Sequence, residues 1–217
     1  NKNLEIDISL HIGSFLAVIV FFRKDIVNFI QNKNLFLKIV IGSLPVMIVG
    51  YLVVKIGFIE QIRNLKVIGW TTLVFGILLY LSDKSNFQNK LNSNFTIKFA
   101  ILIGFLQILS LIPGVSRSGI VISGARMLKF NRYESAKISF LLSIPTLAAV
   151  SLFGINSLIK SESLNISFLM IISVIFSFIF SYLTIKYFLR YIKNFSLNVF
   201  VLYRLLLGIG LLVLAYL

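Results

Sequence analysis

The sequence predicts an all-α integral membrane protein with six transmembrane helices and one re-entrant helical hairpin. Hydrophobic residues make up 58% of the 217 residues, and the mean hydropathy is +0.97. These values exclude an ordinary soluble domain. Several apolar stretches also have the roughly 17–25 residues that a helix needs to cross a bilayer. No polar region is large enough for a second domain, so residues 1–217 are expected to form a single polytopic membrane domain.

The candidate transmembrane helices lie at about residues 8–22, 35–58, 67–81, 133–153, 166–187 and 197–217. The remaining apolar stretch, about 95–130, is long enough to cross twice or to dip in and return on the same side. Two full crossings would each be short, whereas a re-entrant hairpin gives a clear excess of positive charge on one side, as cytoplasmic loops have. With a re-entrant hairpin, one side of the membrane has fourteen basic residues: Arg23, Lys24, Lys33, Lys38, Lys84, Lys90, Lys98, Arg126, Lys129, Arg132, Lys137, Lys186, Arg190 and Lys193. The other side has five: Lys2, Lys55, Arg63, Lys66 and Lys160.

The three spans before this hairpin run opposite to the three after it, which is typical of an inverted-topology repeat. The chain therefore divides into an incomplete first repeat, residues 1–94, and a second repeat, residues 95–217, with the hairpin at about 95–130. Such repeats place the ligand site at broken helices. The first repeat lacks a corresponding hairpin and the chain begins with Asn1, so we expect a fragment of a longer protein.

The hairpin contains the most informative motif, Pro113-Gly114-Val115-Ser116-Arg117-Ser118-Gly119. Proline and the glycines break the helix, and irregular backbone in a bilayer is tolerated only where it is buried in protein or lines a watery cavity. An arginine between such apolar stretches is costly and indicates a functional site. The glycines let the backbone approach a ligand, and the next half-helix begins with free backbone N–H groups. Arg117 adds a positive charge that can donate two hydrogen bonds at once. The motif therefore predicts a phosphate or diphosphate ligand.

The motif supplies most of the candidate site residues. The candidate catalytic residues are Arg117, Ser116 and Ser118, and the candidate substrate-binding residues are Gly114, Gly119, Arg204 and Gln107. All of them except the two glycines have a structural alternative. Arg117 and the serines are also suited to capping the broken helix, Arg204 to snorkelling to the surface, and Gln107 to bonding a neighbouring helix.

No metal site is predicted within the chain. The seven acidic residues fall at span ends or in loops, so no buried carboxylate is expected to bind a metal or act as a base. Cysteine is absent, and packing or a hydrogen bond is the expected role of the single histidine, His11. The formal charge of +14 indicates cytoplasmic loops and contacts with anionic membrane lipids, and no nucleic-acid partner is expected.

The chain resembles the bacterial undecaprenyl-diphosphate phosphatases, also called the bacitracin-resistance proteins. The resemblance is carried by Leu10-His11-Ile12-Gly13-Ser14-Phe15-Leu16-Ala17-Val18, the Pro113–Gly119 motif, Ser139-Phe140-Leu141-Leu142-Ser143-Ile144-Pro145 and Tyr203-Arg204. It implies a multi-pass protein of the bacterial inner membrane that converts the lipid undecaprenyl diphosphate to undecaprenyl phosphate and phosphate, and so recycles the lipid carrier for cell-wall synthesis. It also implies two re-entrant hairpins and a divalent metal, Mg²⁺ or Ca²⁺. Both a monomer and a homodimer are compatible with the sequence.

Two departures from the family limit what the resemblance implies. The family's pair of acidic residues four apart and its Pro-Val-Ser-Ser-Thr-Gly-His block have no match here, so the metal ligands are expected outside this chain. Val121 replaces the usual threonine three residues after the second motif serine, and it cannot donate a hydroxyl to phosphate. The alternative function is a polyprenyl-phosphate transporter or flippase, because inverted repeats with broken helices also suit transport.

Overall fold

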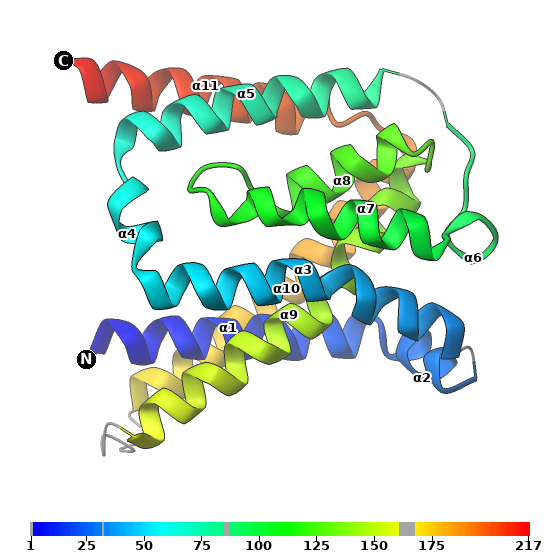
Figure 1. Ribbon diagram of the computed structural model, residues 1–217, viewed down its shortest axis with the longest axis horizontal. Coiled ribbons are helices and arrows are strands. Elements are labelled where there is room, and N and C mark those ends of the chain that lie inside the picture. The colour runs from blue at the N-terminus through cyan, green and yellow to red at the C-terminus, as the bar shows by residue number, and fades with distance from the viewer. Residues whose placement is uncertain (1, 32, 85–86, 161–167) are drawn as a thin grey trace.

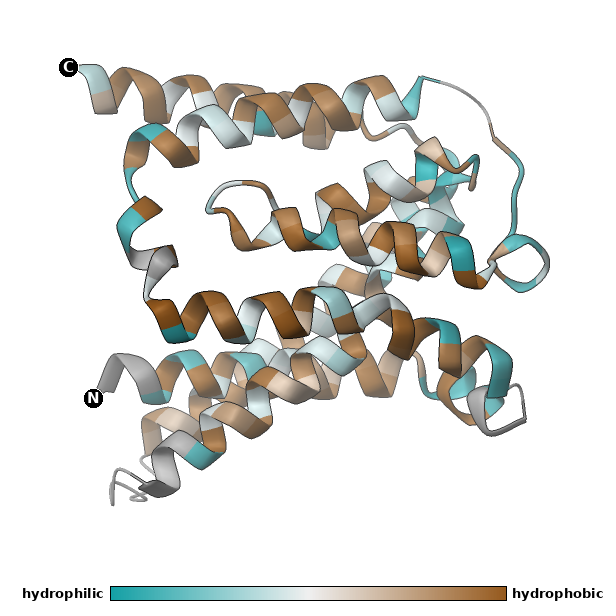
Figure 2. Cartoon of the chain, in the orientation of Figure 1, coloured by the Kyte–Doolittle hydropathy of each residue, from teal (hydrophilic) through white to brown (hydrophobic). Residues whose placement is uncertain are grey.

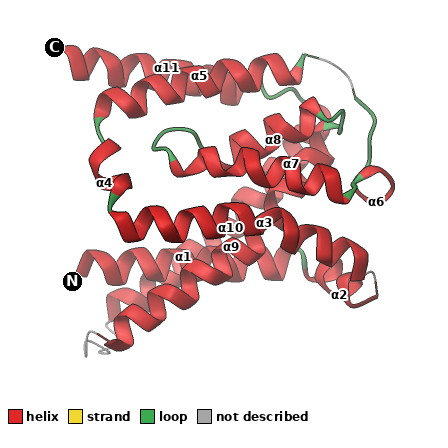
Figure 3. Ribbon diagram, viewed as in Figure 1, coloured by secondary structure: helices red, strands yellow, loops and turns green. Residues whose placement is uncertain are grey.

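The computed structural model describes residues 2–31, 33–84, 87–160 and 168–217, and this part of the chain folds into helices joined by loops (Figures 1 and 3). In chain order the elements are α1 (Lys2–Phe21), α2 (Arg23–Gln31), α3 (Lys33–Ile56), α4 (Phe58–Ile62), α5 (Leu65–Asp83), α6 (Leu91–Asn94), α7 (Ile97–Ile108), the 3₁₀ helix η1 (Leu109–Leu111), α8 (Arg117–Met127), α9 (Arg132–Lys160), α10 (Phe168–Asn194) and α11 (Asn198–Tyr216). The all-α prediction is confirmed.

Among the described residues, five helices are long and apolar enough to cross a membrane: α3, α5, α9, α10 and α11. They correspond to the last five predicted spans, although α3 ends two residues before the predicted 35–58 span does and α11 covers 198–216 of the predicted 197–217. The first two residues of the span predicted at 166–187 lie outside the described residues. The remaining span, predicted at 8–22, lies mostly in α1. The helices α9 and α10 run several residues past the predicted ends, because hydropathy marks only their apolar part, whereas basic residues such as Arg190 and Lys193 are also good helix formers.

In the middle of the molecule, α7 and α8 form a helical hairpin (Figure 1). The chain enters α7 beside α6, reverses through η1 and residues 112–116, and returns along α8 to the end of the molecule where α7 began. The hairpin packs against α3, α5 and α9. Its helices have 12 and 11 residues, about half of what a helix needs to cross a bilayer.

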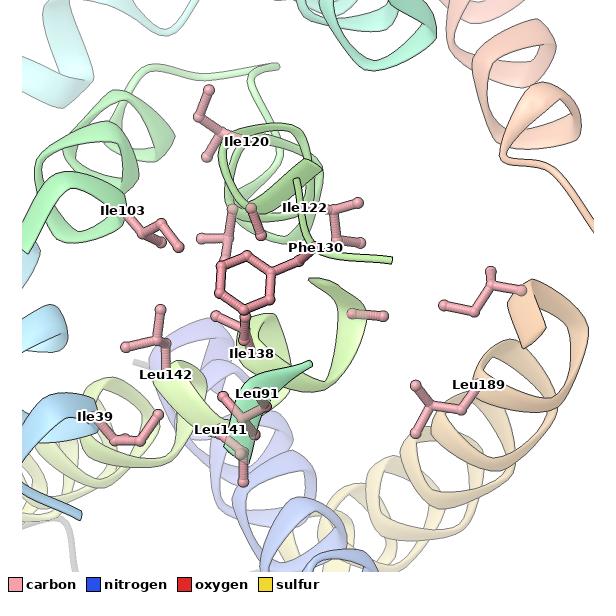
Figure 4. Packing of buried hydrophobic residues seen from close by; sticks show 14 of the residues in the cluster. Ile39, Leu91, Ile103, Ile120, Ile122, Phe130, Ile138, Leu141, Leu142 and Leu189 are labelled. Atoms are coloured by element: carbon pink, nitrogen blue, oxygen red, sulfur yellow. The ribbon is translucent and has the colours of Figure 1, made fainter. Parts of the chain in front are cut away.

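The hydrophobic core lies between the hairpin and α9 (Figure 4). Ile103 of α7, Ile120 of α8 and Ile138 of α9 are almost completely buried there, around the ring of Phe130. α7 also approaches α3 closely, because a Cβ atom on Gly104 would lie 2.5 Å from the carbonyl oxygen of Gly42. Small residues of this kind let membrane helices pack backbone to backbone. The hairpin is thus fixed to its neighbours on both sides.

Asp83 corrects the expectation that no carboxylate would be buried. It ends α5, as predicted for a span end, but its side chain is only 3% exposed. Oδ1 lies 2.7 Å from Nε of Arg132 and 3.2 Å from Nε of Arg126, and Oδ2 accepts a hydrogen bond of 3.0 Å from the N–H of Leu197. The carboxylate therefore connects the ends of α5, α8, α9 and α11 from within the protein, and two guanidinium groups compensate its charge.

Candidate functional site

The loop before α8 has the broken backbone that the Pro-Gly motif predicts. Gly114 has φ +91°, and a Cβ atom there would collide with Oγ1 of Thr71 and lie 2.6 Å from the carbonyl oxygen of Ile68. Ser116 has φ 68°, which is uncommon for a residue with a side chain. Strained backbone of this kind persists only where the surroundings hold it in place, and it is concentrated at functional sites.

Two threonines of α5 hold the start of this loop. Oγ1 of Thr71 lies 2.6 Å from the carbonyl oxygen of Pro113, and Oγ1 of Thr72 lies 3.3 Å from that of Gly114. Both distances fit hydrogen bonds that the hydroxyls donate. The sequence analysis missed these threonines, although two adjacent hydroxyl residues inside an apolar span are a recognisable signal for bonding to another helix or loop.

Arg204 of α11 holds the rest of the loop. Its side chain is buried, and Nη2 donates hydrogen bonds of 2.9 Å and 3.0 Å to the carbonyl oxygens of Gly114 and Val115. These carbonyl groups lie outside regular helix, so a buried donor compensates for the bonds that the break removes. Arg204 thus points into the protein instead of snorkelling to the surface, and it reaches the motif through the backbone.

Arg117 is the first residue of α8, and it lines a cavity of about 530 Å³. Nη1 donates a hydrogen bond of 2.6 Å to Oγ1 of Thr146 in α9, which is its one side-chain hydrogen bond among the described residues. The other cavity walls are mainly apolar side chains of α3 and α9, such as Val46 and Phe153. A single cationic group at an apolar cavity suits an amphiphile with an anionic head.

Ser116 and Ser118 lie beside Arg117 at the start of α8, and both side chains are exposed. Oγ of Ser116 accepts a hydrogen bond of 3.3 Å from the N–H of Gly119, so this serine caps the helix as one of the structural alternatives predicts. The two hydroxyl oxygens are 3.4 Å apart. Hydroxyls, backbone N–H groups and the positive end of the helix dipole thus meet at one place, which favours an anion.

Gln107 is placed differently from the other candidates. Its side chain is fully buried in the face of α7 that also carries Gly104, and it does not line the cavity beside Arg117. Neither its amide nitrogen nor its amide oxygen has a hydrogen-bond partner among the described residues. An unpaired buried amide is costly, and the alternative hydrogen bond to a neighbouring helix is not made among the described residues.

Thr146, the hydrogen-bond partner of Arg117, is a third threonine that the sequence analysis missed. It directly follows Pro145 in the third stretch that carries the family resemblance. The signal is the spacing of Ser139, Ser143 and Thr146, because residues three and four apart lie on the same face of a helix. Val121, in contrast, is completely buried in the core, so it contributes packing there.

The described residues do not fit the divalent metal that the family resemblance implies. They contain no group of three or more His, Cys, Asp or Glu side chains that could hold an ion. The carboxylate of Asp83 is bonded to arginines, Asp25 pairs with Lys137 at 2.6 Å, and Glu134 accepts a hydrogen bond from the N–H of Leu91. No metal-dependent step can therefore be derived from these residues.

Comparison with known proteins identifies close relatives. The family described as "Bacitracin resistance protein BacA" matches residues 1–210. A protein of Pelagibacter ubique named undecaprenyl-diphosphatase is 48% identical over 217 residues, which cover 100% of this chain and 84% of the relative. Proteins of the same name from Saccharophagus degradans and Roseobacter denitrificans are 38% and 36% identical over 230 residues, covering 100% of this chain and 85% and 86% of the relatives.

Proposed function

Because the chain belongs to the BacA bacitracin-resistance protein family, we propose that it is a multi-pass membrane enzyme, an undecaprenyl-diphosphatase. It hydrolyses undecaprenyl diphosphate to undecaprenyl phosphate and phosphate, and thereby recycles the lipid carrier for cell-wall synthesis. The observation that carries the proposal is the position of Arg117, which lies at a helix N-terminus and lines a largely apolar cavity. That arrangement matches a substrate with a diphosphate head and a prenyl tail.

In the proposed complex the diphosphate binds at the start of α8. Arg117 holds two of its oxygens with its planar fork, while Ser116, Ser118 and the first N–H groups of the helix bind the others. Gly119, in the first turn of α8, lets the backbone approach the ligand because it carries no side chain, whereas Gly114 lets the loop pack against α5 and so positions the site. The prenyl chain lies in the apolar part of the cavity between α3 and α9.

Hydrolysis breaks the bond between the terminal phosphorus and the bridging oxygen while water bonds to that phosphorus. Negative charge grows on the oxygens during this step, and preorganised donors in a low-dielectric site stabilise it. Arg117 supplies this stabilisation, and Arg204 is a positioning residue that fixes the loop through the carbonyl oxygens of Gly114 and Val115. We also propose a divalent metal, which the described residues do not hold; when bound, it would polarise a phosphoryl oxygen.

The reaction is tested by phosphate release from a polyprenyl diphosphate in detergent, with the full-length protein and inorganic pyrophosphate as the comparison substrate. We expect kcat/KM to be at least about tenfold lower for pyrophosphate, because it gains no binding energy from the apolar cavity. Gel filtration of the same sample tests for a homodimer. Translocation of the lipid without phosphate release would contradict the proposal and favour a transporter.

For the topology we propose that α1 is a sixth membrane span and that the α7–α8 hairpin is re-entrant, within an inverted repeat. The half-length of the hairpin helices supports this, as does the return of α8 to the end where α7 begins. Hydrophilic residues gather at that end of the molecule, around α2 and α6 (Figure 2). This end is expected to be cytoplasmic because it carries most of the basic residues.

Labelling of single-cysteine variants tests this topology, and the chain has no native cysteine that would interfere. Lys90→Cys before the hairpin and Lys193→Cys near the end of α10 are expected to react with an impermeant thiol reagent from the same side of the membrane. Lys66→Cys, at the start of α5, is the control and should react from the opposite side. Strong labelling of Lys90→Cys and Lys193→Cys from opposite sides would contradict a re-entrant hairpin.

A further inference from the structure

The basic end of the molecule holds a second cavity that shares no lining residue with the one beside Arg117. Its volume is about 390 Å³, and it lies where the end of α8, the start of α9 and the end of α10 meet. Three cationic side chains line it: Arg126, Arg132 and Lys193. The side-chain amide of Asn131 and the phenol of Tyr133 add neutral donors to the same wall.

The buried carboxylate of Asp83 fixes the two arginines of this cavity. It lies 2.7 Å from Nε of Arg132 and 3.2 Å from Nε of Arg126, and its second oxygen accepts a hydrogen bond from the N–H of Leu197. Nη2 of Arg132 also donates a hydrogen bond of 3.4 Å to the carbonyl oxygen of Asp83. Because these bonds hold both guanidinium groups in place, less side-chain entropy is lost when an anion binds.

The cavity has an excess of positive charge. Asp83 does not line it and is a single carboxylate against three cations. Glu134, the nearest acidic residue along the chain, uses Oε2 to accept a hydrogen bond from the N–H of Leu91 and does not line it either. A smaller cavity of about 220 Å³ is lined by Arg132 and Lys84, and there the carboxylate of Asp83 offsets one of the two positive charges.

Nη1 of Arg132 can bind a ligand at this cavity. The structure shows no acceptor for it among the described residues, whereas Nε and Nη2 are both bonded to Asp83. The side chain is 27% exposed, so it is fixed at one side and open at the other. Lys193 is exposed at the rim and makes no ion pair with a described residue. A planar guanidinium next to an ammonium group is well suited to the oxygens of a phosphate.

We propose that this cavity is a second phosphate-binding site, at the end of the molecule opposite the tip of the hairpin. Its ligand is a phosphate group, which comes either from the head of an anionic membrane phospholipid or from free inorganic phosphate. The proposal does not depend on the reaction at Arg117, because the two cavities share no residue and binding is measured directly.

Binding is tested with the full-length protein and two probes. The first is nanodiscs containing phosphatidylglycerol or phosphatidylcholine, with retained lipid measured by native mass spectrometry; the second is inorganic phosphate, measured by calorimetry in neutral detergent. We expect Lys193→Gln to weaken binding of the preferred probe about fivefold, since each basic residue near a membrane surface contributes about that factor. Arg132→Gln should weaken it roughly tenfold or more, because it also removes the fork geometry.

Arg190→Gln is the matched control, because Arg190 is an exposed arginine of α10 that does not line the cavity. It should bind both probes within about twofold of the unchanged protein. Preference for phosphatidylglycerol supports a lipid head as the ligand, and saturable binding of inorganic phosphate that Lys193→Gln weakens supports free phosphate. Binding of neither probe, or equal losses in Lys193→Gln and Arg190→Gln, would overturn the proposal. Lys193→Gln keeps the test valid if loss of Arg132 impairs folding.

Discussion

Asp83→Asn is expected to lower the free energy of unfolding by about 3–5 kcal/mol, the largest stability loss that we expect from a single substitution. The side chain of Arg126 is 1% exposed, and Asp83 is its ion-pair partner. Without the carboxylate, the guanidinium groups of Arg126 and Arg132 face each other with uncompensated charge. The amide that replaces it has one acceptor oxygen, so it can accept from the N–H of Leu197 or from the arginines but not from both, and its NH2 group faces the other donor.

Thermal unfolding in detergent, followed by circular dichroism, measures this effect. The expected loss corresponds to a fall in Tm of about 6–20 °C. Asp25→Asn is the control, because it removes a carboxylate from the ion pair with Lys137, in which the side chains are 29% and 17% exposed. Partly exposed pairs contribute at most about 1 kcal/mol. A Tm for Asp83→Asn that is no lower than that of Asp25→Asn would show that Asp83 does not hold the helix ends together.

The long helices and the helix break could be predicted from the sequence because both depend on local features. Apolar stretches of span length identify the long helices, whatever they pack against. Proline and glycine interrupt a helix at the residues where they occur, and Gly114 indeed has a φ that favours glycine. The cluster of exposed serines around Arg117 could likewise be predicted, because residues two apart at a helix start share one end of the helix.

The burial of Asp83 could not be predicted, because it depends on which helix ends meet in space. Arg126 and Arg132 lie more than forty residues further along the chain, and the span pattern does not show that they converge on the end of α5. The same holds for Arg204, whose acceptors at Gly114 and Val115 are ninety and eighty-nine residues away. Long-range partners of this kind are decided by tertiary packing, which a single sequence does not specify.

Arg117→Ala is expected to abolish phosphate release from undecaprenyl diphosphate in the full-length protein. Loss of one preorganised contact to transition-state charge typically lowers a rate by about 10²–10³. Arg117→Lys should be almost as slow, because it keeps the charge but loses the planar fork that binds two oxygens together. Ser116→Ala should cost less, since the backbone N–H groups of α8 remain to bind the phosphate. The order of the three rates therefore reports on the geometry of the contact as well as on its charge.

The initial rate of phosphate release by Arg117→Ala tests the central claim most directly. Arg63→Ala is the matched control, because Arg63 is an exposed arginine in the loop between α4 and α5 and does not line the cavity beside Arg117. Gel filtration and Tm establish that both variants are folded. If the broken helix is the diphosphate site, the rate of phosphate release by Arg117→Ala is below about a hundredth of that of the unsubstituted full-length protein, while the rate of Arg63→Ala stays near it. A folded Arg117→Ala that retains more than about a tenth of the parent rate would contradict the claim and leave Arg117 as a structural partner of Thr146.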